Sequence, residues 1–368
     1  MKNIAIIGAG AAGLFLCRKL SGKRDLQVYV FERCQQPGTK VRASGGGRAN
    51  IFNTSVMPVC YNRPEFMVSM LQKVSPVTLR DEFSEMGLSM IADEEGRVYP
   101  MSLSSKTVVD VLLETLDNIH HEFGYEVRSL YRKSGKWHVN DYPVAFDNVV
   151  LASGSAANIM PAQQECCSRF LQPLQLKTVP QCPSLVGFVI NRYPKMLSGC
   201  RARAMVSLFH DDSLVHQEAG EVMFKEDGVS GIVILNLSAY YNRLASHNSC
   251  YLLLDFVYQD EHFDTKAHLR RFHSFKGVLH PKLCALYDKT PFDPRRFRLD
   301  INGTYDLSLA QVCHGGVDLC EINEDFSLKR YPELYAAGEL LDVDGICGGY
   351  NLFFAFASAL VVAQSIMV

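Results

Sequence analysis

A glycine-rich turn between a short apolar strand and a helix is the feature that most restricts how this chain can fold. The opening run NIAIIGAGAAGLFLCRKL joins a β-branched apolar stretch, the glycines Gly8, Gly10 and Gly13, and a helical pattern. In this G-x-G-x-x-G spacing the first glycine allows a tight turn, the second lets the backbone approach a pyrophosphate, and the third lets the helix pack on the strand. The free amides of the helix N-terminus, at Ala11 and Ala12, would face the phosphates. The segment therefore predicts a dinucleotide-binding unit.

The next expected strand, LQVYVFER, ends in an acidic residue. Glu32 lies 24 residues after Gly8, where a carboxylate accepts hydrogen bonds from a ribose 2′-hydroxyl and repels a 2′-phosphate. The strand, the helix and the distal acid together argue against a glycine-bearing turn in an unrelated α/β unit. Both NAD and FAD remain possible ligands at this point.

The segment PGTKVRASGGGRANIFNT favours FAD. We interpret it as a loop too long for a simple strand-to-helix connection, and long loops inside compact domains are usually functional. Its glycines permit positive φ and a close approach of the backbone to a planar ring. Lys40 and Arg48 could neutralise a phosphate or a reduced, anionic flavin, while Asn50 and Asn53 supply amide donors and acceptors. A flexible surface loop is the alternative interpretation.

The composition of the chain limits the number of domains, the partners and the cellular compartment that we expect. The 368 residues suggest two or three domains, and the formal net charge of -2 indicates neither a polyanionic partner nor an anionic membrane surface. The 12 cysteines include no C-x-x-C pair, so we predict no metal site and inert thiols at Cys166 and Cys167. The first residues lack a signal-peptide pattern, which predicts a cytoplasmic protein. The longest apolar run, at 352–363, is shorter than the ~20 residues of a membrane span and predicts a buried helix.

Several motifs resemble those of one bacterial flavoprotein family. The string G-x-K-x-x-x-S-G-G-G-R-x-N at 38–50 looks like the family signature, and GRVYP at 96–100 is similar to a second family segment. Further likenesses occur at 220–238, in HGGV at 314–317, and in LYAAGELLDVDGICGGYNLFFAFASA at 334–359. The family is that of the BaiN-type, or aminoacetone oxidase-like, NAD(P)/FAD-dependent oxidoreductases. Recognisable pieces run from one end of the chain to the other.

The resemblance implies that SGGGRAN and CGGYN are two loops flanking the flavin. Glu339, after the expected strand ELYAAGE, would lie near the ribityl hydroxyls. The amides that open the long apolar helix would point at the N1–C2=O edge of the flavin, where negative charge develops on reduction. The residues expected to contact FAD are Gly8, Gly10, Ala11, Ala12, Gly13, Glu32, Arg33, Lys40, Ser44, Gly45, Gly46, Gly47, Arg48, Asn50, Val127, Ala152, Ser153, Gly154, Gly338, Glu339, Asp344, Gly345, Gly348, Gly349, Tyr350, Asn351 and Leu352.

The resemblance also implies an α/β fold in which a discontinuous, Rossmann-like FAD-binding domain carries an inserted β-barrel-like domain with a small helical insert. The expected ranges are 1–178 and 312–368 for the FAD-binding domain, 179–257 and 297–311 for the barrel, and 258–296 for the helical insert. We expect the insert to cap the flavin and to shape the substrate pocket.

Within the insert, ARAMVSLFH, SLVHQEAGEVMF, GIVILNLS and CYLLLDFVY predict strands, and TKAHLRRFHSFKGVLHPKLCALYDK predicts a helical stretch. No second strand-G-x-G-x-x-G-helix unit follows residue 40. Any NAD(P)H would therefore bind transiently and without a nicotinamide domain of its own.

Three residues are candidates for chemistry at the flavin, where the cofactor carries out hydride transfer and the protein can supply a proton. His314 lies in a glycine-rich segment that resembles one close to the ring, and an imidazole can donate near neutral pH. A packed or surface histidine is the alternative. Tyr99, beside Arg97, is a second candidate acid. Cys347 is a candidate redox residue because it precedes a helix N-terminus that would stabilise a thiolate. We interpret Tyr350 as an anchor of its loop.

The chain also departs from the family pattern. Ala49 stands where members often carry Cys, Ile232 stands where they carry Pro, and FFAF at 353–356 replaces Gln-Trp-Ala-Trp. The usual glycine-rich loop after VVLASG is reduced. Because the phosphate and C-terminal flavin motifs are intact, the resemblance predicts FAD binding but no particular substrate.

We expect an FAD-dependent oxidoreductase that reduces an unsaturated C=C bond in a small-molecule substrate with electrons from NAD(P)H, through flavin N5. One alternative is an FAD-dependent oxidase of a small amine, and another is a flavin-containing binding protein with a degenerate pocket. RNA modification would need a basic face, to which 191–204 and 294–299 could contribute. Solvated arginines explain those two runs without nucleic acid. Reactivity towards oxygen and NAD(P)H distinguishes the reductase from the oxidase.

Overall fold

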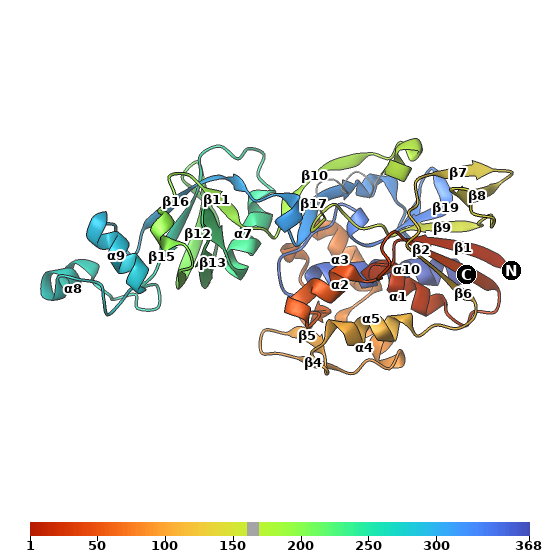
Figure 1. Cartoon of the computed structure of the whole chain (residues 1–368), viewed down its shortest axis with the longest axis horizontal. Coiled ribbons are helices and arrows are strands. Elements are labelled where there is room, and N and C mark those ends of the chain that lie inside the picture. Colours follow the sequence, from red (N-terminus) through yellow and green to blue (C-terminus); the bar gives the residue numbers. More distant parts are fainter. Residues whose placement is uncertain (160–168) are drawn as a thin grey trace. The chain divides into compact units, whose positions relative to one another are not determined.

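The computed structural model describes residues 1–159 and 169–368. Their contacts divide into two compact units, Met1–Cys182 with Val312–Val368, and Pro183–Gln311. The first unit is thus built from two separate stretches of chain, and the second is inserted between them (Figure 1). Cys166 and Cys167 lie outside the described residues.

A six-stranded sheet forms the centre of the first unit, in the order β18-β19-β9-β1-β2-β6. Its strands are β1 (Lys2–Ile7), β2 (Leu26–Glu32), β6 (Ile119–Phe123), β9 (Asn148–Leu151), β18 (Ser327–Leu328) and β19 (Tyr331–Ala336). The strands from β19 to β6 run parallel, and β18 pairs with β19 antiparallel. Ile4, Ala5 and Ile6 are consecutive and all fully buried, because both faces of a parallel sheet are covered. The expected strand, glycine turn, helix and strand are confirmed.

The carboxyl ends of the parallel strands meet at one edge of this sheet. β1 leads into Gly8, β2 ends in Glu32, β9 leads into Ala152, and β19 leads into Ala337 and Gly338. Ligands of open parallel sheets bind in the crevice at this edge. The topology therefore gathers four of the segments expected to contact the cofactor.

One layer of helices covers the sheet. It contains α1 (Ala11–Leu20), α5 (Ser105–Leu113) and α10 (Tyr350–Met367), and α1 contacts both of the others (Figure 1). The Phe356 ring of α10 lies 5.5 Å from the ring of Phe15 on α1 and 4.9 Å from that of Phe83 on α4 (Pro76–Glu85). In the described part of the chain, only α10 is long and apolar enough to cross a membrane, and 72% of it is buried inside the protein. The prediction of a buried helix is confirmed.

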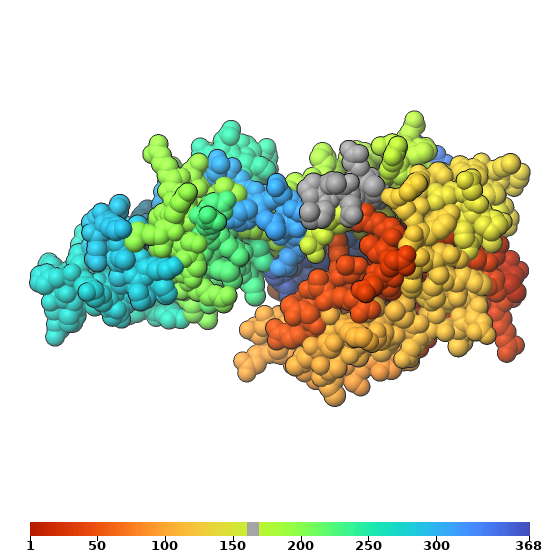
Figure 2. Space-filling model, viewed as in Figure 1, coloured from red at the N-terminus to blue at the C-terminus, as the bar shows by residue number. Residues whose placement is uncertain are grey.

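The segment expected to be a long loop contains regular structure. Residues 37–54 form α2 (Thr39–Ala43), the 3₁₀ turn η1 (Ser44–Gly47) and β3 (Phe52–Asn53), so the prediction of a loop was wrong in part. The short helix follows Gly38, whose φ of 70° reverses the chain before the helix starts. Residues 45–48 are exposed, and this orange segment lies on the surface of the first unit (Figure 2).

The remaining elements of the first unit are short. They are η2 (Pro58–Cys60), α3 (Pro64–Lys73), β4 (Met90–Ala92), β5 (Arg97–Pro100), β7 (Leu130–Lys133), β8 (Lys136–Val139), η4 (Arg169–Leu174), β10 (Thr178–Ser184, which ends in the second unit), β17 (Val312–Val317), η7 (Leu319–Glu321) and η8 (Gly338–Leu340). β17 pairs with β10, and η8 directly follows the sheet strand β19.

A closed barrel forms the second unit, in the order β11-β14-β13-β12-β15-β16. Its strands are β11 (Phe188–Ile190), β12 (Arg201–His210), β13 (Ser213–Phe224), β14 (Gly228–Ser230), β15 (Cys250–Asp255) and β16 (Phe297–Thr304), with the 3₁₀ turns η5 (Lys195–Leu197) and η6 (Leu307–Leu309). Ala204, Val206 and Leu208 alternate along β12 and are fully buried, as a barrel interior requires. The predicted barrel is confirmed.

Two predictions of secondary structure in this unit were wrong. GIVILNLS was expected to be a strand, but the structure has α7 (Ile232–Tyr241) there. The closed barrel offers no free edge to a further strand, and α7 packs on β13, where a Cβ on Gly220 would lie 3.0 Å from Val233. A short apolar run does not distinguish a strand from a buried helix.

The expected single helical stretch is in fact two helices, α8 (Thr265–Phe272) and α9 (Pro281–Lys289). His273, with a left-handed φ of 52°, ends α8, and Pro281 opens α9. A proline is favoured at the first helical position because it has no N–H to leave unpaired there.

Candidate cofactor-binding site

Two of the three motif glycines are required by the fold itself. A Cβ on Gly8, whose φ is 107°, would lie 2.4 Å from the carbonyl oxygen of Ala152. A Cβ on Gly13 would lie 1.9 Å from the carbonyl oxygen of Gly8. The Ala152 N–H donates to Ile7 at 2.9 Å, so β9 is held directly against this turn. These glycines allow α1 and β9 to approach the end of β1.

Gly10 differs from both. It is the N-cap of α1 with a φ of -81°, which any residue can adopt, and a Cβ there would meet nothing within 4 Å. Neither backbone strain nor crowding by the described residues requires a glycine at this position. The open space adjoins the N-terminus of α1, whose first amides, beginning at Ala11, have no partner within the helix. A pyrophosphate that approaches the backbone fits this space.

Glu32 is held at the end of β2 by two backbone amides. Its Oε2 accepts a hydrogen bond from the Ala9 N–H at 2.9 Å, and its Oε1 accepts one from the Cys34 N–H at 2.9 Å. Burial and the adjacent Glu32 carboxylate raise the pKa of the Cys34 thiol. Glu32 thus orders the glycine turn as well as standing where a ribose would bind.

A pocket lies beside this turn. Its lining residues are Ile7, Gly8, Phe31, Glu32, Arg33, Tyr125, Glu126, Val127, Ser153 and Phe170. Five of these, Gly8, Glu32, Arg33, Val127 and Ser153, are residues that the sequence predicted to contact FAD. The buried Ser153 hydroxyl has no hydrogen-bond partner among the described residues. Because buried hydroxyls are normally paired, this orphaned group fits a polar ligand in the pocket.

A Glu32→Ala variant is expected to bind FAD about 10- to 100-fold more weakly, because hydrogen bonds to a charged group are worth about 1.5–3 kcal/mol. The fold should persist with a slightly lower melting temperature, since the amides of Ala9 and Cys34 lose their acceptor. Equilibrium titration of apoprotein with FAD measures the affinity. An unchanged affinity would contradict a ribose contact at Glu32.

The two glycine-rich segments lie against each other. The Asn53 side chain donates to the Gly348 carbonyl at 3.2 Å, and a Cβ on Gly349 would lie 2.6 Å from the Phe52 carbonyl oxygen. With its amide oriented to satisfy both neighbours, Asn50 donates to Phe52 and accepts from the Gly349 N–H, at 3.1 Å each. The structure therefore brings the SGGGRAN and CGGYN loops together.

The first of these loops leaves open backbone. Gly45, Gly46 and Gly47 all have positive φ, and a Cβ on Gly46 or Gly47 would meet nothing within 4 Å. The Ser44 hydroxyl donates to the Val41 carbonyl at 2.7 Å. Arg48 lies over the Tyr99 ring, with its guanidinium carbon 5.5 Å from the ring centroid. The backbone at Gly46 and Gly47 can therefore approach a planar ligand closely.

Hydrogen bonds from Tyr61 and Asn351 anchor the CGGYN loop. The Tyr61 hydroxyl donates to the Tyr350 carbonyl at 2.8 Å, and Asn351 exchanges two hydrogen bonds of 2.9 Å with the backbone of Gly345. Tyr350 is 7% exposed, and Leu352 packs against the core. These contacts fix the amides that open α10, next to Gly349.

Lys40 and Glu339 form an ion pair. The Lys40 Nζ lies 2.8 Å from Glu339 Oε2 and donates to the Ser155 hydroxyl at 3.1 Å. Glu339 Oε1 also accepts from the Cys313 N–H at 3.1 Å. The positive charge of Lys40 is therefore balanced by Glu339. The pair joins α2 to η8 beside the end of β9.

Small residues allow η8 to pack closely on α1. Gly338 has a φ of 70°, and a Cβ there would lie 3.0 Å from the Cβ of Ala12 on α1. Gly154 also has a positive φ, and a Cβ there would meet nothing within 4 Å. Gly154 thus leaves a second open stretch of backbone near Ser153.

His314 belongs to a group of charged side chains in which the two carboxylates are buried. Its Nδ1 lies 2.7 Å from Asp344 Oδ1, and the Asp344 side chain is 1% exposed. The neighbouring Asp342 is fully buried, binds Arg63 through Nε at 2.9 Å and through Nη2, and accepts from the Gly315 N–H at 3.2 Å. One ligand-type atom from each of His314, Asp342 and Asp344 lies within 4.8 Å of the others. Arg63 already supplies a positive charge here, so we interpret the group as an ion-pair network.

The other two candidates for chemistry occupy different places. Tyr99 is 8% exposed on β5 and is packed beneath Arg48 and Gly45. Cys347 is half-buried in the loop before Gly349. This geometry does not test a catalytic role for either residue, so both roles stay predictions.

Sequence reasoning missed Asn62, Arg63, Asp342 and Ser155. The available signal was the DVD tripeptide at 342–344, which places two acids in an apolar surrounding and so predicts buried, paired carboxylates. Their cation could not be found in the same way, because Arg63 is 279 residues distant in sequence.

Residues 2–365 match the HI0933-like protein Rossmann domain. The chain belongs to this family. Its membership confirms the flavoprotein resemblance in the sequence and the class of FAD-dependent oxidoreductases that the resemblance implies.

Two curated relatives match along almost the whole chain. The chain is 26% identical over 405 residues to a 3-dehydro-bile acid delta(4,6)-reductase of Clostridium scindens, with 99% of each protein covered. It is 26% identical over 399 residues to a ribosomal RNA dihydrouridine synthase of Escherichia coli, covering 98% of this chain and 97% of the relative.

A solved structure shares the fold. The 3-ketosteroid delta1-dehydrogenase from Sterolibacterium denitrificans, in complex with 1,4-androstadiene-3,17-dione, is 10% identical with a TM-score of 0.52. The match covers 100% of this chain and 99% of that one. The likeness extends to both units and concerns the fold alone.

Proposed function

We propose that this chain binds FAD at the carboxyl edge of its parallel sheet and reduces an unsaturated C=C bond in a small organic substrate, with NAD(P)H as the electron donor. The observation that carries the proposal is the open space at Gly10, because the fold itself gives no reason for a glycine there. The Ser153 hydroxyl in the adjoining pocket supports it as a second group suited to a polar ligand.

The residues of the chain would hold the cofactor in three places. The turn at 8–13 and the first amides of α1 would bind the pyrophosphate, and Glu32 would accept hydrogen bonds from a ribose. The open glycines Gly46 and Gly47 and the amides at the start of α10 would face the flavin ring. When bound, FAD supplies the hydride chemistry.

The names of the curated relatives support C=C reduction. One is a delta(4,6)-reductase, and the other makes dihydrouridine, which carries two more hydrogens than uridine. Three of the seven arginines and lysines in the basic runs that RNA binding would use are paired with a carboxylate. Arg201 lies 3.5 Å from Glu221, Arg298 lies 2.7 Å from Asp300, and Arg295 lies 3.2 Å from Asp255. Pairing at these three positions lowers the positive potential that the two runs offer to phosphates.

The test is an anaerobic visible spectrum of the purified protein, recorded before and after adding NADH and then NADPH. We expect a yellow protein that bleaches with one donor and regains its colour with a conjugated enone. A yellow protein that neither donor reduces would contradict the nicotinamide step and favour the oxidase or binding alternative. A colourless protein that takes up no added FAD would contradict the cofactor assignment.

A further inference from the structure

The His314 group differs from the rest of the site because its two carboxylates, Asp342 and Asp344, are buried and held in fixed positions. The Asn62 N–H donates to the Asp344 carbonyl, and the Asp344 N–H donates to Asn62 Oδ1, each at 2.9 Å. This two-sided contact fixes the backbone of Asp344. Its carboxylate therefore holds the Nδ1 edge of His314 in one orientation, while the histidine side chain remains 18% exposed.

The balance of charge favours a protonated imidazole. Asp342 and Asp344 are both fully buried, and Arg63 binds Asp342. Burying a carboxylate is costly, and a positive partner in contact with it lowers this cost. His314 is in contact with Asp344 and can carry that charge. A carboxylate this close stabilises the imidazolium over the neutral ring.

The neighbouring thiols and phenol are neutral near pH 7. Burial raises the pKa of Cys182 to about 11, and the nearby Asp344 and Asp342 act in the same direction. Burial also raises the pKa of Cys313 to about 11 and that of Tyr61 well above its ordinary value. These three groups therefore carry no charge near pH 7.

We propose that Asp344 is a positioning residue that keeps His314 protonated and correctly oriented, so that the imidazole delivers the proton during reduction of the C=C bond. This inference rests on the proposed function. In the reduction the π bond breaks and two C–H bonds form: one carbon receives a hydride that originates from the nicotinamide donor, and the other receives the proton of His314. The substrate is reduced, the donor is oxidised, and the neutral imidazole regains a proton from water.

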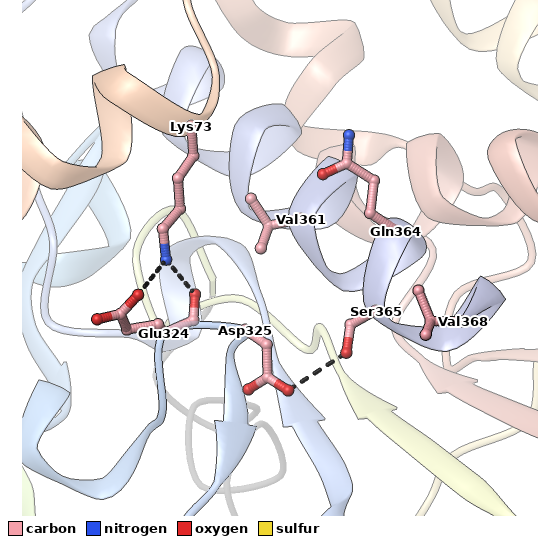
Figure 3. Close-up of a pocket in the computed structure, with 7 residues that line it drawn as sticks. All are labelled: Lys73, Glu324, Asp325, Val361, Gln364, Ser365 and Val368. Atoms are coloured by element: carbon pink, nitrogen blue, oxygen red, sulfur yellow. Dashed lines mark hydrogen bonds and ion pairs between the residues drawn. The ribbon is translucent and has the colours of Figure 1, made fainter.

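The first test measures protonation directly, by NMR titration of the full-length protein labelled with ¹⁵N-histidine. The His314 signal is assigned as the one missing in His314→Gln. In the wild type its titration midpoint should lie above that of the exposed His262. In Asp344→Asn the midpoint should fall. Asp325→Asn is the matched control, because Asp325 accepts from Ser365 at 3.3 Å in a separate surface hollow (Figure 3); it should leave the His314 midpoint unchanged.

The second test is the pH profile of flavin reoxidation by an enone, measured per bound flavin. Because the active form is the imidazolium, the wild-type rate should be high below the His314 midpoint and should fall as the pH rises through it. Asp344→Asn should move this fall to lower pH and reduce the rate near neutral pH about 100-fold, within the usual range for general acid catalysis. A merely structural role for Asp344 would lower the rate without moving the profile.

A wild-type midpoint at or below that of His262, or one that Asp344→Asn leaves in place, would overturn the inference. If Asp344→Asn does not fold, the wild-type comparison with His262 decides by itself. Failure of the proposed function has a different signature. A protein that reduces no C=C acceptor contradicts that function, whereas the titration reports on the Asp344–His314 pair without turnover.

Discussion

A Gly10→Val variant is expected to fold normally and to contain almost no FAD. Valine suits the backbone, because the φ of -81° is ordinary and, apart from the adjoining residues, no described atom lies within 4 Å of the new Cβ. Replacing glycine at a helix N-cap should cost only about 1 kcal/mol of stability. The isopropyl group would occupy the space where a pyrophosphate meets the amides of α1. Losing two charge-assisted hydrogen bonds costs at least about 3 kcal/mol, or more than ~100-fold in affinity.

The flavin-to-protein absorbance ratio and the melting temperature measure this result. Gly277→Val is the matched control, because Gly277 also has open space for a Cβ and no positive φ, and it lies in the second unit between α8 and α9. It should keep full flavin content. Gly13→Ala should instead destabilise the fold, since its Cβ would lie 1.9 Å from the Gly8 carbonyl oxygen. A Gly10→Val protein with full flavin occupancy would disprove the phosphate-loop assignment.

His314→Ala is expected to slow reoxidation of the reduced enzyme by a C=C acceptor by about 100-fold or more, the usual contribution of a general acid. Reduction by NAD(P)H should change far less, because hydride transfer to the flavin needs no proton from His314. Stopped-flow absorbance under anaerobic conditions separates the two half-reactions. Bleaching reports reduction by the donor, and the return of the yellow colour reports transfer to the acceptor.

The controls for this variant address stability and specificity. His314→Gln keeps an N–H donor for Asp344 but cannot supply a proton. Its reoxidation should therefore be as slow as that of His314→Ala, while its melting temperature should be closer to that of the wild type. His262→Ala removes an exposed histidine of the second unit and should leave both half-reactions unchanged. If reoxidation in His314→Ala keeps the wild-type rate, His314 is not the proton donor.

Most of the correct predictions about the fold came from short sequence motifs. The alternation of β1, the glycine turn and α1 depends on residues within 20 positions of one another, and the structure confirms it. GIVILNLS was predicted wrongly because its apolar residues suit a strand and a buried helix equally, and the closed barrel decides between them. The break at His273 was missed because a left-handed residue other than glycine leaves no clear signal in the sequence.

The sequence by itself determined the family, the parallel sheet and the positions of both glycine-rich loops, because each depends on motifs of short span. Only the tertiary structure distinguished Gly10, which the fold leaves open, from Gly8 and Gly13, which it crowds. It also decided the charge partners, because Lys40 and Glu339 are 299 residues apart. Pairing over such distances depends on which strand ends and loops the sheet brings together, and no local pattern of residues encodes that choice.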